Sequence, residues 1–109
     1  MQGPRKPIRP DRVRKIPSNF SWIDREILHR GLLARLSQEE ILLYFFLVLV
    51  AGPDGTSFWS YQRMGKHLKL TPDEVCAAAR SLIKRDLVAF EYPTFQVLAI
   101  PEDPERGEP

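Results

Sequence analysis

The feature that most constrains the fold is an uninterrupted apolar run of 11 residues, Ile41 to Ala51. It follows Ser37-Gln38-Glu39-Glu40, a capping box in which the serine hydroxyl and the Glu40 carboxylate satisfy N–H groups of a first helical turn. Gly52-Pro53 then stops the helix, so the pattern predicts a helix over 38–51. Because every residue from Ile41 onward is apolar, both faces need cover. We expect this helix to lie at the centre of the fold or to be shared with a second copy of the chain.

Length, cysteine content and hydropathy narrow the class of protein. The apolar run is well short of the ~20 residues that cross a bilayer, and the first 19 residues hold no signal-peptide apolar stretch. The chain has 109 residues, enough for one core, and its single cysteine, Cys76, cannot form an internal disulfide. This excludes a disulfide-stapled secreted scaffold. We therefore expect one cytoplasmic domain that does not contact a membrane.

The net charge of +2 is unevenly distributed. Residues 1–19, called the arm below, contain four prolines and carry +5, residues 20–100 are neutral, and residues 101–109 carry −3. Neither end has periodic apolar residues that would offset the entropy of ordering. We predict a disordered, non-helical arm, a folded domain over 20–100 and a disordered acidic tail. Basic arms follow phosphates or lie in a DNA minor groove, although a solubilising leader would have the same composition. The arm's candidate DNA-binding residues are Arg5, Lys6, Arg9, Arg12, Arg14 and Lys15.

Three further helices are predicted around the apolar run. The first covers residues 21–36, where the apolar positions recur at helical spacing with charged residues between them. After a turn at 53–56 and a short strand over 57–59, Ser60 caps a helix over 61–69. Thr71-Pro72-Asp73-Glu74 is a second capping box, which starts a helix over 72–85. The inward residues of this last helix are expected to be Val75, Ala78, Ala79, Leu82 and Ile83.

A β-hairpin is predicted at the end of the domain. Residues 87–92 and 95–100 are rich in Val, Phe, Leu and Ile, and Pro93-Thr94 forms the bend between them. The domain is also rich in large aromatic residues, and much of this material is expected in the core. These aromatics include Trp22, Phe45, Phe46, Phe58, Trp59, Tyr92 and Phe95.

The order of helix, short strand, helix, turn, helix and hairpin resembles a winged helix-turn-helix domain. The resemblance covers about residues 37–100: small Gly65 stands where two helices approach closely, and Leu70 fills the turn. Lys69 occupies a turn position often held by glycine. The lead-in from Phe20 is similar to winged helices of plasmid and transposon replication initiators. The implied fold is α+β, mainly α, with a three-helix core, an extra N-terminal helix and a small antiparallel hairpin wing.

The resemblance also implies a function. In such domains the second helix of the motif enters the major groove of double-stranded DNA, and the first crosses the backbone. This implies a transcriptional regulator or replication-associated factor of a mobile element. Groove contacts would come from Arg80, Ser81 and Lys84, and Thr71 could donate to a phosphate. Backbone contacts would come from Gln62, Arg63, Lys66 and Lys69.

Two features oppose this interpretation. Asp73 and Glu74 stand in the first turn of the 72–85 helix, where they would repel phosphates. The hairpin tip, residues 91–94, has no Lys or Arg, so no DNA contact is assigned to it. The basic residues could equally be solvated helix faces. The alternative is a winged-helix interaction module without DNA binding, whose partner uses the apolar hairpin. A homodimer is compatible with either function.

Catalysis has little support in the sequence. There is no glycine-rich phosphate loop, HExxH, nucleophile elbow or cysteine pair. His29 and His67 lie on different predicted helices without matched ligand spacing, and Cys76 is expected to be a half-buried small side chain. We expect no enzyme activity, no metal, no cofactor and no small-molecule substrate.

Overall fold

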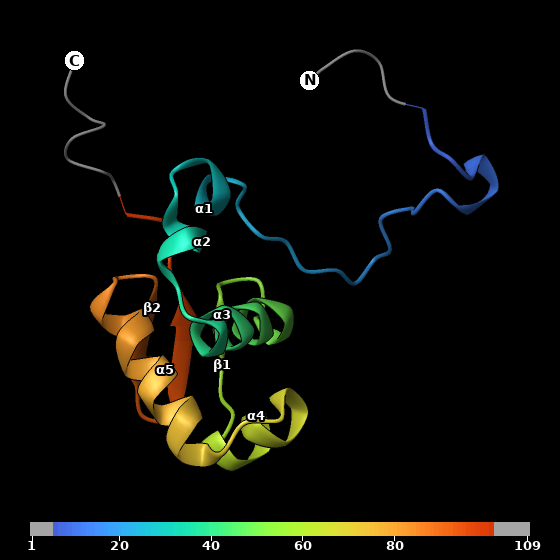
Figure 1. Ribbon diagram of the computed structural model, residues 1–109. Coiled ribbons are helices and arrows are strands. Elements are labelled where there is room, and N and C mark those ends of the chain that lie inside the picture. The colour runs from blue at the N-terminus through green and yellow to red at the C-terminus, as the bar shows by residue number, and fades with distance from the viewer. Residues whose placement is uncertain (1–5, 102–109) are drawn as a thin grey trace.

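The computed structural model describes residues 6–101, which contain five α-helices and a three-stranded antiparallel sheet (Figure 1). Their bounds are α1 Glu26–His29, α2 Leu32–Arg35, α3 Gln38–Val50, β1 Thr56–Ser57, α4 Tyr61–Leu68, α5 Pro72–Lys84, β2 Val88–Glu91 and β3 Thr94–Val97. The predicted α+β, mainly helical class is therefore confirmed. Arg5 and the acidic tail after Pro101 lie outside the described residues.

The capped apolar helix forms as predicted. The Ser37 hydroxyl accepts from the Glu40 N–H at 3.1 Å, and the Glu40 carboxylate accepts from the Ser37 N–H at 2.8 Å. The helix ends at Val50, one residue before the predicted end, because Ala51 is already extended. Leu43 and Leu47 are fully buried where α3 packs against α4, α5 and β3. The helix is therefore central, and its inner face forms much of the core.

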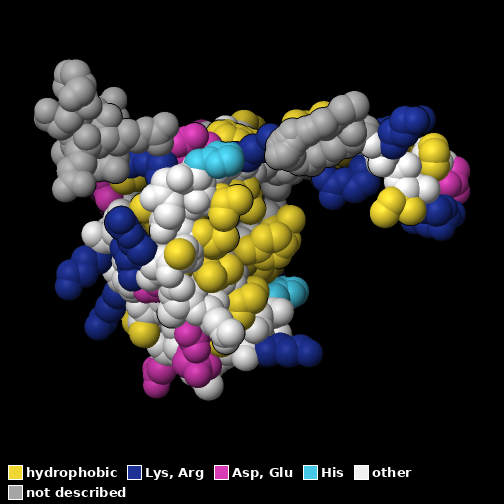
Figure 2. All heavy atoms as spheres, turned by 45° about the horizontal axis from the view of Figure 1, so that its top comes forward, with side chains coloured by type: hydrophobic (Ala, Val, Ile, Leu, Met, Phe, Trp, Pro, Cys, Tyr) yellow, Lys and Arg dark blue, Asp and Glu magenta, His cyan; other side chains and the backbone are white. Residues whose placement is uncertain are grey.

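The chain itself covers only one face of α3, so of the two expected arrangements the central position is seen and sharing with a second copy stays a prediction. Leu42, Phe45 and Leu49 are 39%, 50% and 52% exposed. They recur three and four residues apart, so they share one face of the helix. We call this set the α3 stripe. The elements that pack on α3 do so on its other side, which leaves this face uncovered. Figure 2 shows a band of hydrophobic side chains on the surface of the molecule.

The single helix predicted over 21–36 is two one-turn helices, α1 and α2. Gly31 between them has a φ of +75°, a left-handed conformation that interrupts the helical path and that glycine adopts readily. Ile27 of α1 and Leu36 at the end of α2 are buried in the core, whereas Leu28 of α1 stays exposed. The segment before α1 is held along α3, since the Ser21 hydroxyl donates to the Leu49 carbonyl at 2.8 Å.

The α4–turn–α5 unit has the close approach that the sequence predicted at Gly65. A Cβ added at Gly65 would overlap the carbonyl oxygen of Leu70, so only glycine fits. The Gly65 carbonyl accepts from the Leu70 N–H at 2.9 Å, which closes the end of α4. Lys69 takes up the turn with φ +61° and ψ +42°. Both helices end one residue earlier than predicted. Ile83, predicted to be buried, is exposed near the end of α5.

The hairpin is shorter than predicted and pairs with one more strand. β2 and β3 are antiparallel with Phe90 opposite Phe95, and β1 joins the other edge of β3 through Ser57 and Phe95. The predicted strand over 57–59 is instead Thr56–Ser57. Expected core aromatics divide into two sets: Phe46 and Phe95 are buried and Trp59 is partly buried, whereas the exposed ones are Trp22, Phe45, Phe58 and Tyr92. Trp22, Phe58 and Tyr92 lie in segments between helices and strands, and Phe45 lies on the uncovered face of α3.

The described residues of the arm are exposed and run away from the body (Figure 1). The prediction that the arm holds no helix is wrong at one place, because residues Pro10–Arg12 form a 3-10 turn. Proline lacks an N–H but loses no bond at a first helical position, and Arg9 and Asp11 pair across the turn at 2.9 Å. Within the part of the chain that the structure describes, no helix has the length and apolar character of a membrane span.

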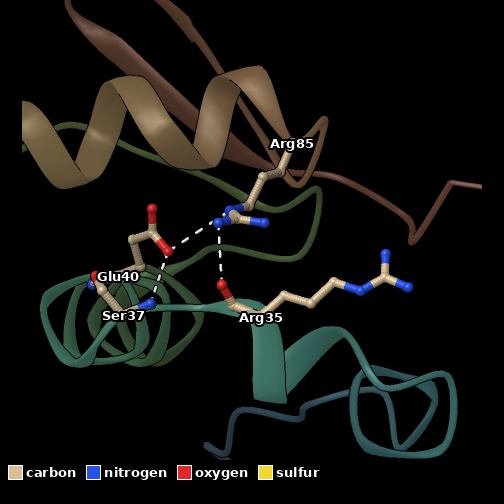
Figure 3. A network of polar contacts seen from close by, with 4 residues as sticks. All are labelled: Arg35, Ser37, Glu40 and Arg85. Carbon is tan, nitrogen blue, oxygen red and sulfur yellow. Dashed lines mark hydrogen bonds and ion pairs between the residues drawn. The ribbon is translucent and has the colours of Figure 1, made fainter.

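A polar network ties the end of α5 to the start of α3 (Figure 3). Arg85 donates to the backbone carbonyl of Arg35 at 3.0 Å, and its Nε lies 3.5 Å from a Glu40 carboxylate oxygen. The same oxygen accepts from the Ser37 N–H. This network fixes the C-terminal half of α5 relative to the core.

Candidate nucleic-acid interface

The outward face of α5 carries two of the predicted groove-contacting residues. Ala77, Arg80 and Lys84 are exposed at spacings of three and four, so they form one stripe about 10 Å long. We call this set the α5 stripe. Val75 and Leu82, on the opposite face of α5, are fully buried in the core, and this packing sets the direction in which the α5 stripe faces. Ser81, the third predicted groove residue, is only half-exposed and flanks the stripe.

Thr71 is the N-cap residue of α5. Its hydroxyl oxygen accepts from the Glu74 N–H at 3.1 Å, and the Thr71 N–H donates to the Glu74 carboxylate at 2.9 Å. The cap therefore uses the Thr71 side chain to start α5. The two acidic residues of the first turn, Asp73 and Glu74, are exposed. Asp73 lies four residues before Ala77, on the same side of the helix as the α5 stripe.

The predicted backbone-contacting residues lie on α4 and in the turn. Gln62 and Lys66 are exposed at a spacing of four, on one face of α4. Lys69 is exposed in a left-handed conformation that costs a non-glycine residue about 1–2 kcal/mol. A positive charge is thus held in the turn at a position where glycine would fit the backbone better.

Arg63, predicted with this group, has a different setting. Its guanidinium carbon lies 4.3 Å from the centre of the Trp59 ring, a cation–π contact. Trp59 in turn meets Phe46 of α3 edge-on at 5.0 Å. Arg63 is therefore anchored on an aromatic side chain, and it makes no ion pair with a carboxylate among residues 6–101.

Lys and Arg side chains do not merge into one patch on the face seen in Figure 2. There, Lys and Arg side chains lie on either side of a group of Asp and Glu side chains at the lower edge. In the arm, Lys6, Arg12, Arg14 and Lys15 are exposed, whereas Arg9 is paired with Asp11. The positive charge of the described chain is therefore divided between the arm and separate parts of the body.

An aromatic groove beside α4 was missed by sequence reasoning. It has a volume of about 500 Å³ and lies between the start of α4 and the β2–β3 hairpin. It is lined by Phe58, Trp59, Ser60, Tyr61, Arg63, Phe90, Tyr92, Pro93 and Phe95. The available signal was the Tyr-Pro-Thr bend, which places Tyr92 at the exposed tip of the hairpin.

Tyr61 connects this groove to α5. Its ring lies 6.3 Å from that of Phe95 in the groove. Burial, reinforced by the neighbouring Cys76, raises the pKa of the Tyr61 phenol, and the positive charge of Arg80 opposes that rise. Tyr61 is the first residue of α4, and α4 packs on α5, so the groove and the α5 stripe belong to neighbouring helices. Cys76 is half-buried, as predicted.

A second cleft, of about 740 Å³, lies between residues 18–24, the 51–55 turn and the end of β3. Its two carboxylates are engaged locally: Asp24 accepts from the Glu26 N–H at 2.9 Å, and Asp54 accepts from the Thr56 N–H and hydroxyl. These hydrogen bonds from Thr56 lower the pKa of Asp54. Each carboxylate of the cleft thus accepts hydrogen bonds from a residue two positions further along the chain.

No family model, curated protein or solved structure matches the chain. Within residues 6–101, no group of three or more His, Cys, Asp and Glu side chains is placed to hold a metal ion. His29 and His67 are exposed on α1 and α4. The arrangement that remains for a functional interpretation is the α4–turn–α5 unit with its exposed basic residues and the adjoining aromatic groove.

Proposed function

We propose that the chain is a winged helix-turn-helix protein that binds double-stranded DNA and acts as a transcriptional regulator or replication-associated factor in the cytoplasm. The order of elements, the tight α4–α5 turn at Gly65 and the antiparallel hairpin support the winged-helix assignment. The observation that carries the DNA-binding function is the α5 stripe, which is exposed, basic at Arg80 and Lys84, and fixed from below by buried residues.

In this proposal α5 lies in the major groove, and its C-terminal half contacts the base edges. Ala77 has a short side chain that lets the helix approach the base edges, while Arg80 and Lys84 pair with guanine acceptors or phosphates. In this orientation the start of α5 points away from the nearer DNA backbone, so Asp73 does not face the phosphates. Lys66 and Lys69 contact the phosphates from α4 and the turn, and the arm adds sequence-independent attraction.

A salt titration with charge-matched variants tests the proposal. Binding of a labelled random duplex is measured in the full chain, in Arg80→Gln and in Arg25→Gln, which removes the same charge from an exposed site before α1. The slope of log K against log salt should fall by about 1 in Arg80→Gln and stay unchanged in Arg25→Gln. Absence of binding at low salt, or equal effects of the two variants, would contradict the proposal.

The contribution of the arm is measured separately. Replacing Arg12, Arg14 and Lys15 with glutamine in the full chain should lower the salt slope by up to about 3, because each lost phosphate contact removes close to one unit. If this variant loses all binding while Arg80→Gln keeps it, the arm alone binds DNA and α5 does not read the groove.

The α3 stripe favours a second candidate function, assembly with a second copy of the chain. α3 has no charged residue from Ile41 to Val50, so two copies of the stripe can meet without burying an unpaired charge. The spacing of Leu42, Phe45 and Leu49 suits a helix–helix seam related by a two-fold axis. Phe45→Glu should then yield monomers in sedimentation equilibrium, whereas Ile83→Glu, on an exposed site of α5, should remain dimeric. A wild-type monomer at every concentration would contradict assembly.

A further inference from the structure

The aromatic lining and the single positive charge of the groove restrict the kind of ligand that it can bind. Seven of its nine lining residues are aromatic or proline, and the single charged one is the cation Arg63. Glu91, the nearest carboxylate in the hairpin, does not line the groove, and its side chain alternates away from Phe90 along β2. A cationic ligand would meet Arg63 without a counter-charge. The groove therefore suits a ligand with a flat apolar part and a negative charge.

Two exposed aromatic rings stand at the groove. Phe58, before α4, is 73% exposed, and Tyr92, at the hairpin tip, is 88% exposed. They come from separate segments of the chain, and Phe90 lies against both Phe95 and Tyr92 at 4.5 and 6.4 Å. Exposed rings over a firm aromatic base are the arrangement on which unpaired nucleobases stack, because every base has a π face. A groove of about 500 Å³ falls in the size range of small-ligand sites.

Arg63 is placed to meet a phosphate. Its guanidinium is held over the Trp59 ring at 4.3 Å and, within the described chain, has no carboxylate partner. A guanidinium stacked on a ring keeps its N–H donors at the edge, where they can pair with phosphate oxygens. The charge and the rings thus lie at one site.

We propose that this groove binds single-stranded nucleic acid, with an unpaired base stacked on Tyr92 and Phe58 and its phosphate on Arg63. The inference rests on the proposed function, because it adds a second form of nucleic acid to the same interface. Tyr61 lines the groove at the start of α4, and α4 packs on α5, so duplex and unpaired strand would be held on neighbouring helices. Such an interface fits DNA in which a duplex adjoins a melted segment.

The test compares two labelled probes on the full chain. One is an oligo(dT) strand of about 12 nucleotides, a length that single-strand sites accommodate, and the other is a blunt random duplex. Tyr92→Ala and Phe58→Ala should each weaken oligo(dT) binding roughly 5- to 150-fold, the cost of one lost stack, and leave duplex binding unchanged. Tyr92→Phe keeps the ring and should bind oligo(dT) like the wild type. Both alanine sites are exposed, so folding should be unaffected, which circular dichroism checks.

Arg63 gives an independent readout. Arg63→Gln should lower the salt slope for oligo(dT) by about 0.7, the value for one phosphate contact on a single strand. Lys84→Ala should weaken duplex binding and spare oligo(dT). The two variants therefore separate the groove from the α5 stripe.

Each outcome decides between the two proposals. Duplex binding without oligo(dT) binding overturns the groove assignment alone, and loss of both overturns the DNA-binding function as well. The groove assignment is also overturned if Tyr92→Ala and Phe58→Ala bind oligo(dT) as tightly as the wild type. The competing occupant is a neutral proline-rich peptide, which aromatic grooves can hold. Tyr92-dependent binding of such a peptide, in place of oligo(dT), would contradict the assignment.

Discussion

The guanidinium of Arg85 lies 3.5 Å from the Glu40 carboxylate, joining the C-terminal cap of α5 to the capping box of α3. The side chain of Glu40 is 8% exposed and that of Arg85 is 37% exposed, so the carboxylate is the partner that depends on the pair. Since the same arginine also donates to the Arg35 carbonyl, one side chain connects α5 to both the α2–α3 junction and α3. The contacts of Arg85 therefore help to set the position of the α5 stripe, although Arg85 is not part of it.

Arg85→Ala should lower the free energy of unfolding by about 1–3 kcal/mol, since it removes the ion-pair partner of the buried Glu40 carboxylate and the hydrogen bond to the Arg35 carbonyl. The partial exposure of Arg85 keeps the expected loss below that of a fully buried pair. Urea unfolding measures it, with Arg25→Ala as the exposed arginine control. Equal stability of the two variants would show that the pair does not stabilise the fold.

Gly65→Ala should destabilise the chain by about 1–3 kcal/mol, because the new Cβ meets the Leu70 backbone carbonyl, which cannot move aside like a flexible side chain. Gly52→Ala is the matched control, since its Cβ would make only ordinary contacts at 3.7 Å or more. It should change stability by no more than about 0.5 kcal/mol. Thermal unfolding compares the two. A silent Gly65→Ala would mean that α4 and α5 do not approach as described.

Lys69→Gly should raise stability by about 0.5–1 kcal/mol while weakening duplex binding. Glycine relieves the left-handed conformation at φ +61°, and the substitution removes a charge from the turn. Lys69→Asn removes the same charge and tolerates the left-handed region less well than glycine. Both variants should therefore lose the same affinity but differ in melting temperature. Full affinity in both would remove Lys69 from the interface.

The fold should lose stability in alkali through Tyr44. Burial, and secondarily the charge of Asp24, raises the pKa of this phenol above its ordinary value. Folding therefore favours the neutral phenol. Its contribution is full below the unfolded pKa of about 10 and is lost as the pH rises toward the folded pKa. Urea unfolding at about pH 8 and about pH 11 should show a smaller decline in Tyr44→Phe than in the wild type. Identical declines would contradict this role.

Local chemistry explains what could be predicted from the sequence. The caps at Ser37 and Thr71 satisfy their own first turns, so their hydrogen bonds depend on neighbours within three residues. The close approach at Gly65 was likewise visible in the pattern of small and apolar residues. These signals located α3, α4 and α5 to within one residue at their ends.

Tertiary context decided what the sequence pattern left undetermined. Apolar character alone could not show that Phe45 and Tyr92 stay exposed, because the number of elements packing on each face is a property of the whole fold. The Arg85–Glu40 pair joins segments far apart in the chain and has no local signature. At Gly31, helical periodicity continued through a residue whose backbone turns left-handed.

The most direct test of the central claim is an NMR titration of the isotopically labelled full chain with a random duplex, following each backbone amide. We predict saturable shifts along the α5 stripe at Ala77, Arg80 and Lys84, and at Lys69 in the turn, with small changes along the α3 stripe. Shifts confined to the arm or to the α3 stripe, or no shifts at low salt, would contradict the account.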